Sequence, residues 1–410
     1  MLPRLVTAAV VLAGCTTSVV AWGAAGHEIA ATIAQIHLHP SVLPSMCEIL
    51  NFTSKNPNEP QCHLAPVATW ADKLRYKMRW SAPLHYVGAV GDHPSQTCVF
   101  PGNRGWAGKQ GGNVLGAIRN VTTILEDSVY HSKRGKISAS QYDAANEALK
   151  FLIHFMGDVH MPLHLTGRDR GGNSDKICTL YGTVSLSPRL SGPFLGSTNG
   201  PLPSPKIEYA LRGTIYDSYV RMIMWEGVLG KWANDVPEWL TCPAPTQSRS
   251  LSVGFFSSLG AFWQQALLVW NRVAGGAMDT DDDLICPYYW AKPIHALNCE
   301  IVWPKALDEP PYNHTRFDGA SSSHHHEFVS PDVELAQVDR AGRFVGGPPG
   351  GPYLELDTPE YSGAISKQWI IEKLLAQAGI RLAGVLNYLF ADIEDPEEAK
   401  LWNRGLRIDF

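Results

Sequence analysis

The stretch KFLIHFMGDVHMPLH, residues 150–164, decides the fold. It closes a segment of helical periodicity that predicts a helix over about 139–160. His154 and Asp158 lie four positions apart, so both side chains project from one face of that helix and can bind one divalent cation. The alternative for such a pair is a hydrogen-bonded contact inside the core.

A third candidate ligand follows directly. Pro162 ends the helix, which frees His164 to turn back toward the same cavity. His160 stands two positions after Asp158, so it points elsewhere, and we expect a structural role for it. Three candidate ligands within eleven residues favour a metal site over a core pair.

Outward from this segment, Asp72 in TWADKLR and His85 in APLHY also have apolar and aromatic neighbours. An unpaired charge is costly in such surroundings, and a zinc ion would offset that cost. The alternatives are a salt bridge from Asp72 to Arg75 and a helix-capping role for His85. His27 is near the start of the first predicted helix, whereas His37 and His39 at its end are expected at the surface.

Helical periodicity dominates the chain and strand alternation is scarce, so we predict an all-α domain. The predicted helices cover residues 27–39, 63–79, 112–131, 139–160, 207–231, 254–273 and 365–392. Residues 311–351 are rich in Ser, Gly, Pro and His and are interpreted as a low-complexity surface insertion. Its histidines His324, His325 and His326 are expected in a solvent-exposed loop, where they could also bind metal adventitiously.

Length and composition set limits on the function. The chain has 410 residues, 45% of them hydrophobic, which is enough for a large core in a single domain over 22–395 with a tail at 396–410. The net charge of -5 excludes a protein that holds nucleic acid mainly through a Lys/Arg surface. A nucleic-acid enzyme remains possible if bound metal supplies the positive charge.

The first 21 residues resemble a cleavable secretory signal, with an early Arg4, a short apolar run and small residues at Val19 and Ala21. The mature chain would then begin at Trp22. No later stretch reaches the roughly 18 apolar residues of a membrane span, so we expect a secreted protein without a membrane partner. Three N-x-S/T acceptors agree with glycosylation on that route: Asn51, Asn120 and Asn313.

Eight cysteines are present, and Cys15 would leave with the signal. The remaining seven predict three disulfides and one free thiol in an oxidising compartment. Spacing does not determine the connectivity, although Cys47 and Cys62 form the easiest local pair.

Several segments together resemble the S1/P1 nuclease family, the zinc-dependent nucleases of fungi and plants that share an all-α, multi-helix fold with bacterial zinc phospholipase C. The matching segments are WGAAGH at 22–27, WADKLR at 70–75, LHY at 84–86, GGN at 111–113, HFMGDVHMPLH at 154–164, GGN at 171–173 and CPYYWAKPIH at 286–295. A weaker match, LDTPEYSG, lies at 356–363.

The resemblance implies a cleft with three zinc ions. One ion would be held by Asp72, His85, His154 and Asp158. A second would be held by His27 and by the free amine and carbonyl oxygen of Trp22, with Asp158 bridging the two ions. Signal removal would create this site, because an α-amine can lose its proton to zinc and an amide nitrogen cannot serve as that ligand. Arg75 matches a cation that contacts phosphate.

The third zinc site is where the chain departs from the family. His164 would be its first ligand, and the others normally come from an Asn-Leu-His-x-x-Trp-Asp segment that is missing here, since no histidine lies between His164 and His295. We therefore expect two intact sites and one incomplete site. Residues 177–203, with Cys178 as the unpaired cysteine, are interpreted as a gene-model error; the alternative is a genuine lineage-specific loop.

Two smaller points follow from the resemblance. Gly88 occupies a position where the family usually carries an acidic residue that orients the attacking water, and Asp92 is the nearest replacement unless it is a turn residue. The family's cysteine pattern suggests the bridge Cys98–Cys286, which leaves Cys242 with Cys299 by elimination.

The function implied is a secreted, glycosylated, monomeric endonuclease that hydrolyses single-stranded DNA and RNA to 5′-nucleotides and also acts as a 3′-nucleotidase. One alternative is a zinc phospholipase C-like phosphodiesterase. The other is a secreted metal-binding protein with impaired or no catalysis, because one zinc site is incomplete.

Overall fold

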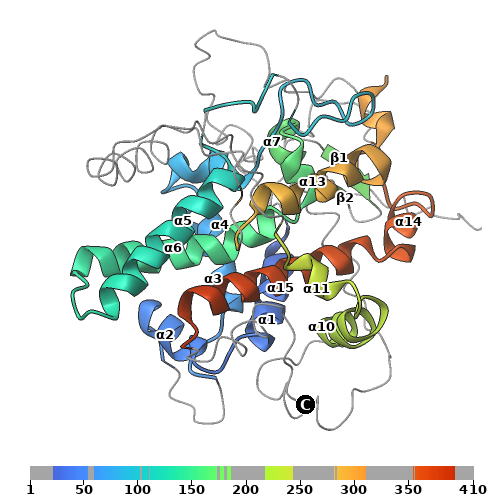
Figure 1. Cartoon of the computed structure of the whole chain (residues 1–410). Coiled ribbons are helices and arrows are strands. Elements are labelled where there is room, and N and C mark those ends of the chain that lie inside the picture. Colours follow the sequence, from blue (N-terminus) through green and yellow to red (C-terminus); the bar gives the residue numbers. More distant parts are fainter. Residues whose placement is uncertain are drawn as a thin grey trace, which may run out of the picture.

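The computed structural model describes residues 22–53, 60–101, 104–109, 111–172, 176–179, 182–185, 218–242, 281, 284–310, 354 and 356–392. Helices dominate these residues, which confirms the all-α class (Figure 1). With η marking 3-10 and π turns, the helices are α1 (Ala24–Ile36), α2 (Val42–Ile49), α3 (Ala65–Ala68), α4 (Trp70–Leu74), η1 (Arg79–His85), α5 (Val114–Ser132), α6 (Ala139–Asp158), η2 (Pro162–Leu165), α7 (Asp169–Gly172), α10 (Ser218–Met222), η3 (Ile223–Lys231), α11 (Val236–Trp239), α13 (Pro287–Leu297), η4 (Asn298–Val302), η5 (Lys305–Asp308), α14 (Ser362–Lys367) and α15 (Ile370–Phe390).

The core is built around α6 and α15. Most residues of α15 are buried, including residues on all sides of the helix, as expected of a helix enclosed by the core. It packs against α1 and α6, and α5 lies alongside α6 (Figure 1). The last eight residues of α6, Phe151–Asp158, are all buried, so the metal-binding pattern of the sequence lies at the centre of the molecule.

The beginnings of the two long helices α5 and α6 follow from their capping residues. Ser138 and Gln141 form a capping box at the start of α6, each side chain bonding the other residue's backbone amide. The side chain of Asn113 accepts a hydrogen bond from the Gly116 amide at 3.1 Å and caps α5. The first GGN motif is therefore a helix start, two residues later than predicted.

Two predicted helices are interrupted. The segment predicted as one helix over 365–392 is divided into α14 and α15 at Trp369, whose φ of 57° is left-handed. The segment over 63–79 is likewise divided, into α3 and α4. Periodicity does not register a single residue that leaves the helical region, because buried residues continue on both sides of it, from Ile365 to Ile370.

His37, just after the end of α1, was expected at the surface but is only 4% exposed. The cause is α15, which covers this end. The side-chain amide of Asn387 donates to the His37 carbonyl at 3.0 Å and accepts from the His39 amide at 2.8 Å.

A small antiparallel hairpin follows α7. Strand β1 (Lys176–Thr179) pairs with β2 (Gly182–Ser185), and Lys176 faces Ser185. The hairpin lies at the start of the segment 177–203 that the sequence predicts as anomalous. The remainder of that segment lies outside the described residues.

Three disulfides link cysteines in the described part of the chain, and one of them is a predicted pair. Cys47–Cys62 is confirmed. The other two predicted pairs are wrong, because Cys98 is bonded to Cys299 and Cys242 to Cys286. The exchange has a structural reason: Cys299 lies in η4 and Cys286 caps α13, so the two cysteines occupy opposite ends of one helical segment.

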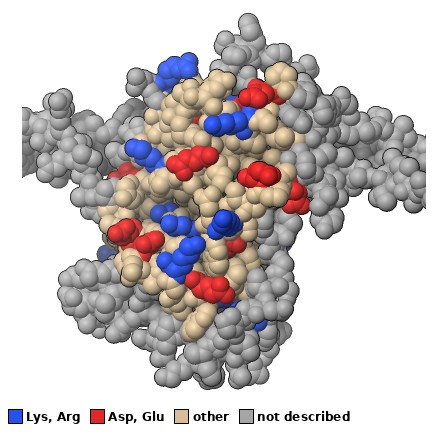
Figure 2. Space-filling view, turned by 90° about the vertical axis from the view of Figure 1, so that its right-hand side faces the viewer, with Lys and Arg blue, Asp and Glu red and all other residues tan. Residues whose placement is uncertain are grey.

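Several predictions concern residues outside the described part of the chain: the signal at 1–21, the helix at 254–273, the insertion at 311–351 with Asn313, and the tail at 396–410. None of the described helices is long and apolar enough to cross a lipid bilayer. On the face in Figure 2, Lys and Arg alternate with Asp and Glu, with no large area of a single sign.

Candidate metal centre

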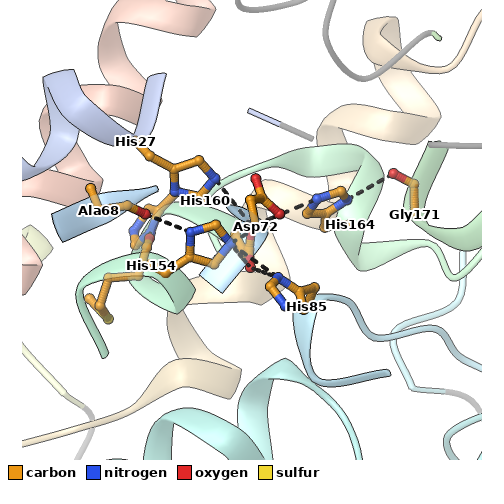
Figure 3. A network of polar contacts seen from close by, with 10 residues as sticks. His27, Ala68, Asp72, His85, His154, His160, His164 and Gly171 are labelled. Carbon is orange, nitrogen blue, oxygen red and sulfur yellow. Dashed lines mark hydrogen bonds and ion pairs between the residues drawn. The ribbon is translucent and has the colours of Figure 1, made fainter. Parts of the chain in front are cut away.

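Six side chains from five elements converge in the interior. They are His27 of α1, Asp72 of α4, His85 at the end of η1, His154 and Asp158 of α6, and His164 of η2. Figure 3 labels all of them except Asp158. Two triplets among them present ligand atoms within 4.8 Å of one another: His27, His154 and Asp158, and Asp72, His85 and His154.

Asp158 is the centre of this cluster. Its Oδ2 atom lies 2.9 Å from Nδ1 of His85 and 3.3 Å from Nε2 of His154. Its Oδ1 atom lies 3.5 Å from Nε2 of His27 and 3.8 Å from Nε2 of His164. The two oxygens thus face different histidines, which is the arrangement a bridging carboxylate needs.

Backbone carbonyls orient two of the histidines. Nδ1–H of His154 donates to the Ala68 carbonyl at 2.7 Å, and Nδ1–H of His164 donates to the Gly171 carbonyl at 2.8 Å (Figure 3). Each bond leaves the Nε2 lone pair directed at the cluster. Such a bond on the far nitrogen is what holds metal-binding histidines in the required tautomer.

The cluster contains buried polar atoms that have no hydrogen-bond partner. They are Nδ1 and Nε2 of His27, Oδ2 of Asp72, Nε2 of His85, Oδ1 of Asp158 and Nε2 of His164. Each such atom costs free energy unless something satisfies it. Imidazole nitrogens and carboxylate oxygens are donors that zinc accepts, so these residues fit a zinc site.

The pKa values of the cluster follow from burial. Desolvation raises the pKa of Asp158 to about 8 and lowers the pKa of His164 to about 4. Burial also lowers the pKa of His27, with a further contribution from His154, His164 and His85. His27 and His164 are therefore neutral at pH 7, and the neutral imidazole is the form that binds a metal.

Close approach of α1 and α6 brings His27 into the cluster. The His27 ring stacks on His154 with centroids 4.0 Å apart and planes 10° from parallel. Gly157 makes this possible, because a Cβ atom at that position would collide with Nδ1 of His27. Sequence reasoning missed Gly157, although a glycine beside two ligands in a helix is the signal that could have found it.

Comparisons with known proteins identify relatives of this chain. The S1/P1 Nuclease family model matches residues 22–185. Endonuclease 2 of Arabidopsis thaliana is 32% identical over 229 residues, which cover 55% of this chain and 70% of that protein. The chain belongs to the S1/P1 nuclease family. Nuclease S1 of Aspergillus oryzae is 35% identical over 175 residues, 42% of this chain and 54% of that protein.

Nuclease P1 of Penicillium citrinum is 34% identical over 158 residues, 38% of this chain and 52% of that protein. S1/P1 nucleases are zinc-dependent hydrolases of phosphodiester bonds, so the chain is a hydrolase of that class. The family match begins at Trp22, the predicted mature terminus, and ends at Ser185, within the predicted anomalous segment.

Two further residues that the sequence predicts for the site, Trp22 and Arg75, lie beside the cluster. Trp22 is 1% exposed and its ring covers Gly26, one residue before His27. Arg75 follows α4, and its charge contributes to lowering the pKa of His85, after desolvation. Its guanidinium donates to the Tyr76 hydroxyl at 2.9 Å.

Asp92 is bound elsewhere. Its Oδ2 lies 2.9 Å from Nε2 of His295, and its Oδ1 accepts the Val99 amide at 3.0 Å. Both oxygens thus have partners outside the six-residue cluster. These contacts favour a structural role beside the Cys98–Cys299 disulfide over the predicted role at the attacking water.

His160 is structural, as expected. Nδ1–H donates to the Met156 carbonyl at 2.7 Å, and Nε2 accepts from Nη1 of Arg381 at 2.8 Å. Arg381 in turn donates from Nε to the Trp239 carbonyl at 2.9 Å. This buried arginine links the end of α6, which carries His154 and Asp158, to α15 and α11.

Proposed function

We propose that the mature chain is a secreted zinc-dependent endonuclease that hydrolyses single-stranded DNA and RNA to 5′-nucleotides and removes 3′-phosphates. The observation that carries the proposal is Asp158, whose two oxygens face four histidines, while Nε2 of His27 and Nε2 of His164 are buried without a hydrogen-bond partner. Membership of the S1/P1 nuclease family supports the phosphodiesterase chemistry.

The residues divide between two zinc ions. Asp72, His85 and His154 would bind the first, and His27 would bind the second with the amine and carbonyl oxygen of Trp22. Asp158 would bridge both. Bound zinc supplies positive charge for the phosphoryl oxygens and the acidity that makes a nucleophile from water at neutral pH.

The chain's own groups then position the substrate. Arg75 is half-buried next to the cluster and would bind phosphate oxygens through its planar guanidinium. Single strands are favoured because an unpaired base can enter the site and stack without the cost of unstacking a duplex. Asp92 stays a candidate for orienting water, although its contacts argue against it.

The third site would be incomplete. His164 directs Nε2 at the cluster, and no second histidine or aspartate of the described residues completes a triad around it. We infer that the chain holds two zinc ions, and that one domain over 22–395 acts as a monomer. Residues 177–203 stay interpreted as a gene-model error, which reading the transcript over these codons tests.

The test uses protein that begins at Trp22, alongside protein with one additional alanine before Trp22. Each is assayed for zinc content and for hydrolysis of single-stranded DNA, RNA, a 3′-nucleotide and a phosphatidylcholine emulsion, with and without a chelator. We expect chelator-sensitive cleavage of the first three substrates and loss of one zinc ion in the extended protein.

Cleavage of phosphatidylcholine alone would contradict the proposal in favour of a phospholipase C. Zinc binding without hydrolysis of any substrate would identify a metal-binding protein that has lost catalysis. Equal zinc content in the two proteins would remove the Trp22 amine from the ligand set.

A further inference from the structure

The segment WADKLRYKMRW, residues 70–80, leads from the metal ligand Asp72 toward the metal ligand His85. It places two large aromatic rings in solvent, Tyr76 at 61% exposure and Trp80 at 60%. These are the most exposed large hydrophobic side chains of the described residues. Singly exposed rings are common on protein surfaces, but these two lie in the segment that joins two of the six residues of the candidate metal centre.

The Trp80 ring is anchored to the metal centre through a series of aromatic contacts. Its centroid lies 5.7 Å from that of Phe151, edge to face, and Phe151 stacks on Phe155 at 5.0 Å. Phe155 in turn contacts the His85 ring at 5.3 Å. Trp80 also lies five residues before His85 in η1, a distance of about 10 Å along a 3-10 helix.

Tyr76 is held by an arginine. Arg75 lies over the Tyr76 ring at 4.9 Å and donates a hydrogen bond to its hydroxyl at 2.9 Å. The ring is therefore presented in a defined orientation directly beside the predicted phosphate-binding guanidinium.

The surroundings of the two rings are cationic, although the chain as a whole is acidic. Four of the eleven residues at 70–80 are Lys or Arg and only Asp72 is acidic. The cations are Lys73, Arg75, Lys77 and Arg79. Surfaces that bind single-stranded nucleic acid combine cations with exposed aromatic rings. The cations attract the phosphates, and the bases stack on the rings.

We propose that Tyr76 and Trp80 form a platform on which bases of the single strand stack while a neighbouring phosphodiester lies at the metal centre. This inference rests on the proposed nuclease function and adds to it the surface that favours unpaired bases. A paired base cannot reach the platform, since its faces are covered by its neighbours in the duplex.

The experiment compares Trp80→Ala, Trp80→Phe and Tyr76→Ala with the unaltered mature protein. Tyr130→Ala is the matched control, because Tyr130 is 54% exposed and lies under Arg134 at 3.5 Å on α5, as Tyr76 does under Arg75. Zinc content and thermal unfolding are measured first for every variant.

Hydrolysis is then measured on three substrates: a short single-stranded oligonucleotide, the same strand with abasic residues beside the cleaved bond, and bis(4-nitrophenyl) phosphate. Trp80→Ala should lower kcat/KM on the base-bearing strand by about 5- to 150-fold, mainly through KM. Rates on the abasic strand and on the small diester should stay within about twofold of the unaltered protein. Trp80→Phe should restore most of the activity, and Tyr130→Ala should change nothing.

An equal loss on the base-bearing and abasic strands, or no loss on either, would overturn the platform. If the unaltered protein cleaves none of the substrates, the nuclease proposal fails by itself. Fluorescence anisotropy of the labelled, uncleaved strand then measures binding separately from cleavage. With the platform, Trp80→Ala should weaken binding of the base-bearing strand and leave binding of the abasic strand unchanged.

Discussion

Oδ2 of Asp158 lies 2.9 Å from Nδ1 of His85, a residue 73 positions away, and Oδ1 of the same carboxylate faces His27 and His164. One buried carboxylate therefore contacts histidines that lie far apart in the sequence. Burial raises its pKa to about 8, because the protein interior solvates the charged form poorly.

Asp158→Asn should remove the bridge while keeping the shape of the side chain. We expect loss of bound zinc and a fall in phosphodiesterase activity of more than about 100-fold, the upper end of what loss of a supporting group costs at metal sites. Metal analysis and a hydrolysis assay measure the two effects. Asp127→Asn, at an exposed position of α5, is the control. Full zinc content in Asp158→Asn would contradict the central role of this carboxylate.

The buried His37 should make stability depend on pH. Desolvation lowers its pKa from 6.5 to about 4, and its Nε2 atom has no hydrogen-bond partner. The unfolded chain then binds a proton that the folded chain does not, so the stabilisation is complete above pH 6.5 and is lost as pH falls toward 4. Between pH 7 and pH 5 the loss is about 2 kcal/mol.

Urea unfolding of the unaltered protein and of His37→Leu at both pH values isolates this contribution. The leucine variant should lose about 2 kcal/mol less than the unaltered protein over the same interval. Parallel pH dependence in the two proteins would mean that His37 is protonated in the folded state.

Arg381→Met should destabilise the fold without removing zinc. The substitution leaves Nε2 of His160 and the carbonyl of Trp239 buried without their donor, at a cost of about 3 kcal/mol in the free energy of unfolding. Adding His160→Leu should recover part of that loss, since it removes one of the two unpaired acceptors. Arg134→Met, at an exposed position just after α5, serves as the control, and zinc loss from Arg381→Met would show that the contact acts on the metal centre.

The three disulfides should differ in how much their removal lowers the free energy of unfolding. The loops closed by Cys47–Cys62, Cys242–Cys286 and Cys98–Cys299 span 15, 44 and 201 residues. On the chain-entropy model their loss costs about 3, 4 and 5 kcal/mol in that order. Paired serine variants and thermal unfolding provide the comparison, and peptide mapping of the unreduced protein checks the connectivity.

The success and failure of sequence reasoning here have a common physical cause. His154 and Asp158 are neighbours in one helix, so their spacing alone predicts that they share a face. The role predicted for Asp92 rests on its proximity in sequence to Gly88, whereas in the structure its Oδ2 atom contacts Nε2 of His295, 203 positions away. The predicted pairs Cys98–Cys286 and Cys242–Cys299 are wrong because the sequence does not distinguish Cys286 from Cys299. Only the packing of α13 and η4 determines which of the two cysteines each partner meets.

Local periodicity also predicts the extent of α5 and α6 to within two residues, because capping residues mark their ends. It does not predict the left-handed Trp369 or the burial of His37, which depend on where α15 lies. The exposed rings of Tyr76 and Trp80 were not identified from the sequence, since exposure of an aromatic residue is a property of the folded surface.

The backbones of Gly88 and Gly167 meet so closely that a Cβ atom on Gly88 would overlap Gly167 and lie 2.9 Å from the Thr166 carbonyl oxygen. A side chain at position 88 would therefore force the two chain segments apart, since the nearest atoms belong to the backbone and cannot rotate away. Packing alone keeps residue 88 a glycine, so an aspartate introduced there should destabilise the fold whether or not its carboxylate reaches the metal centre.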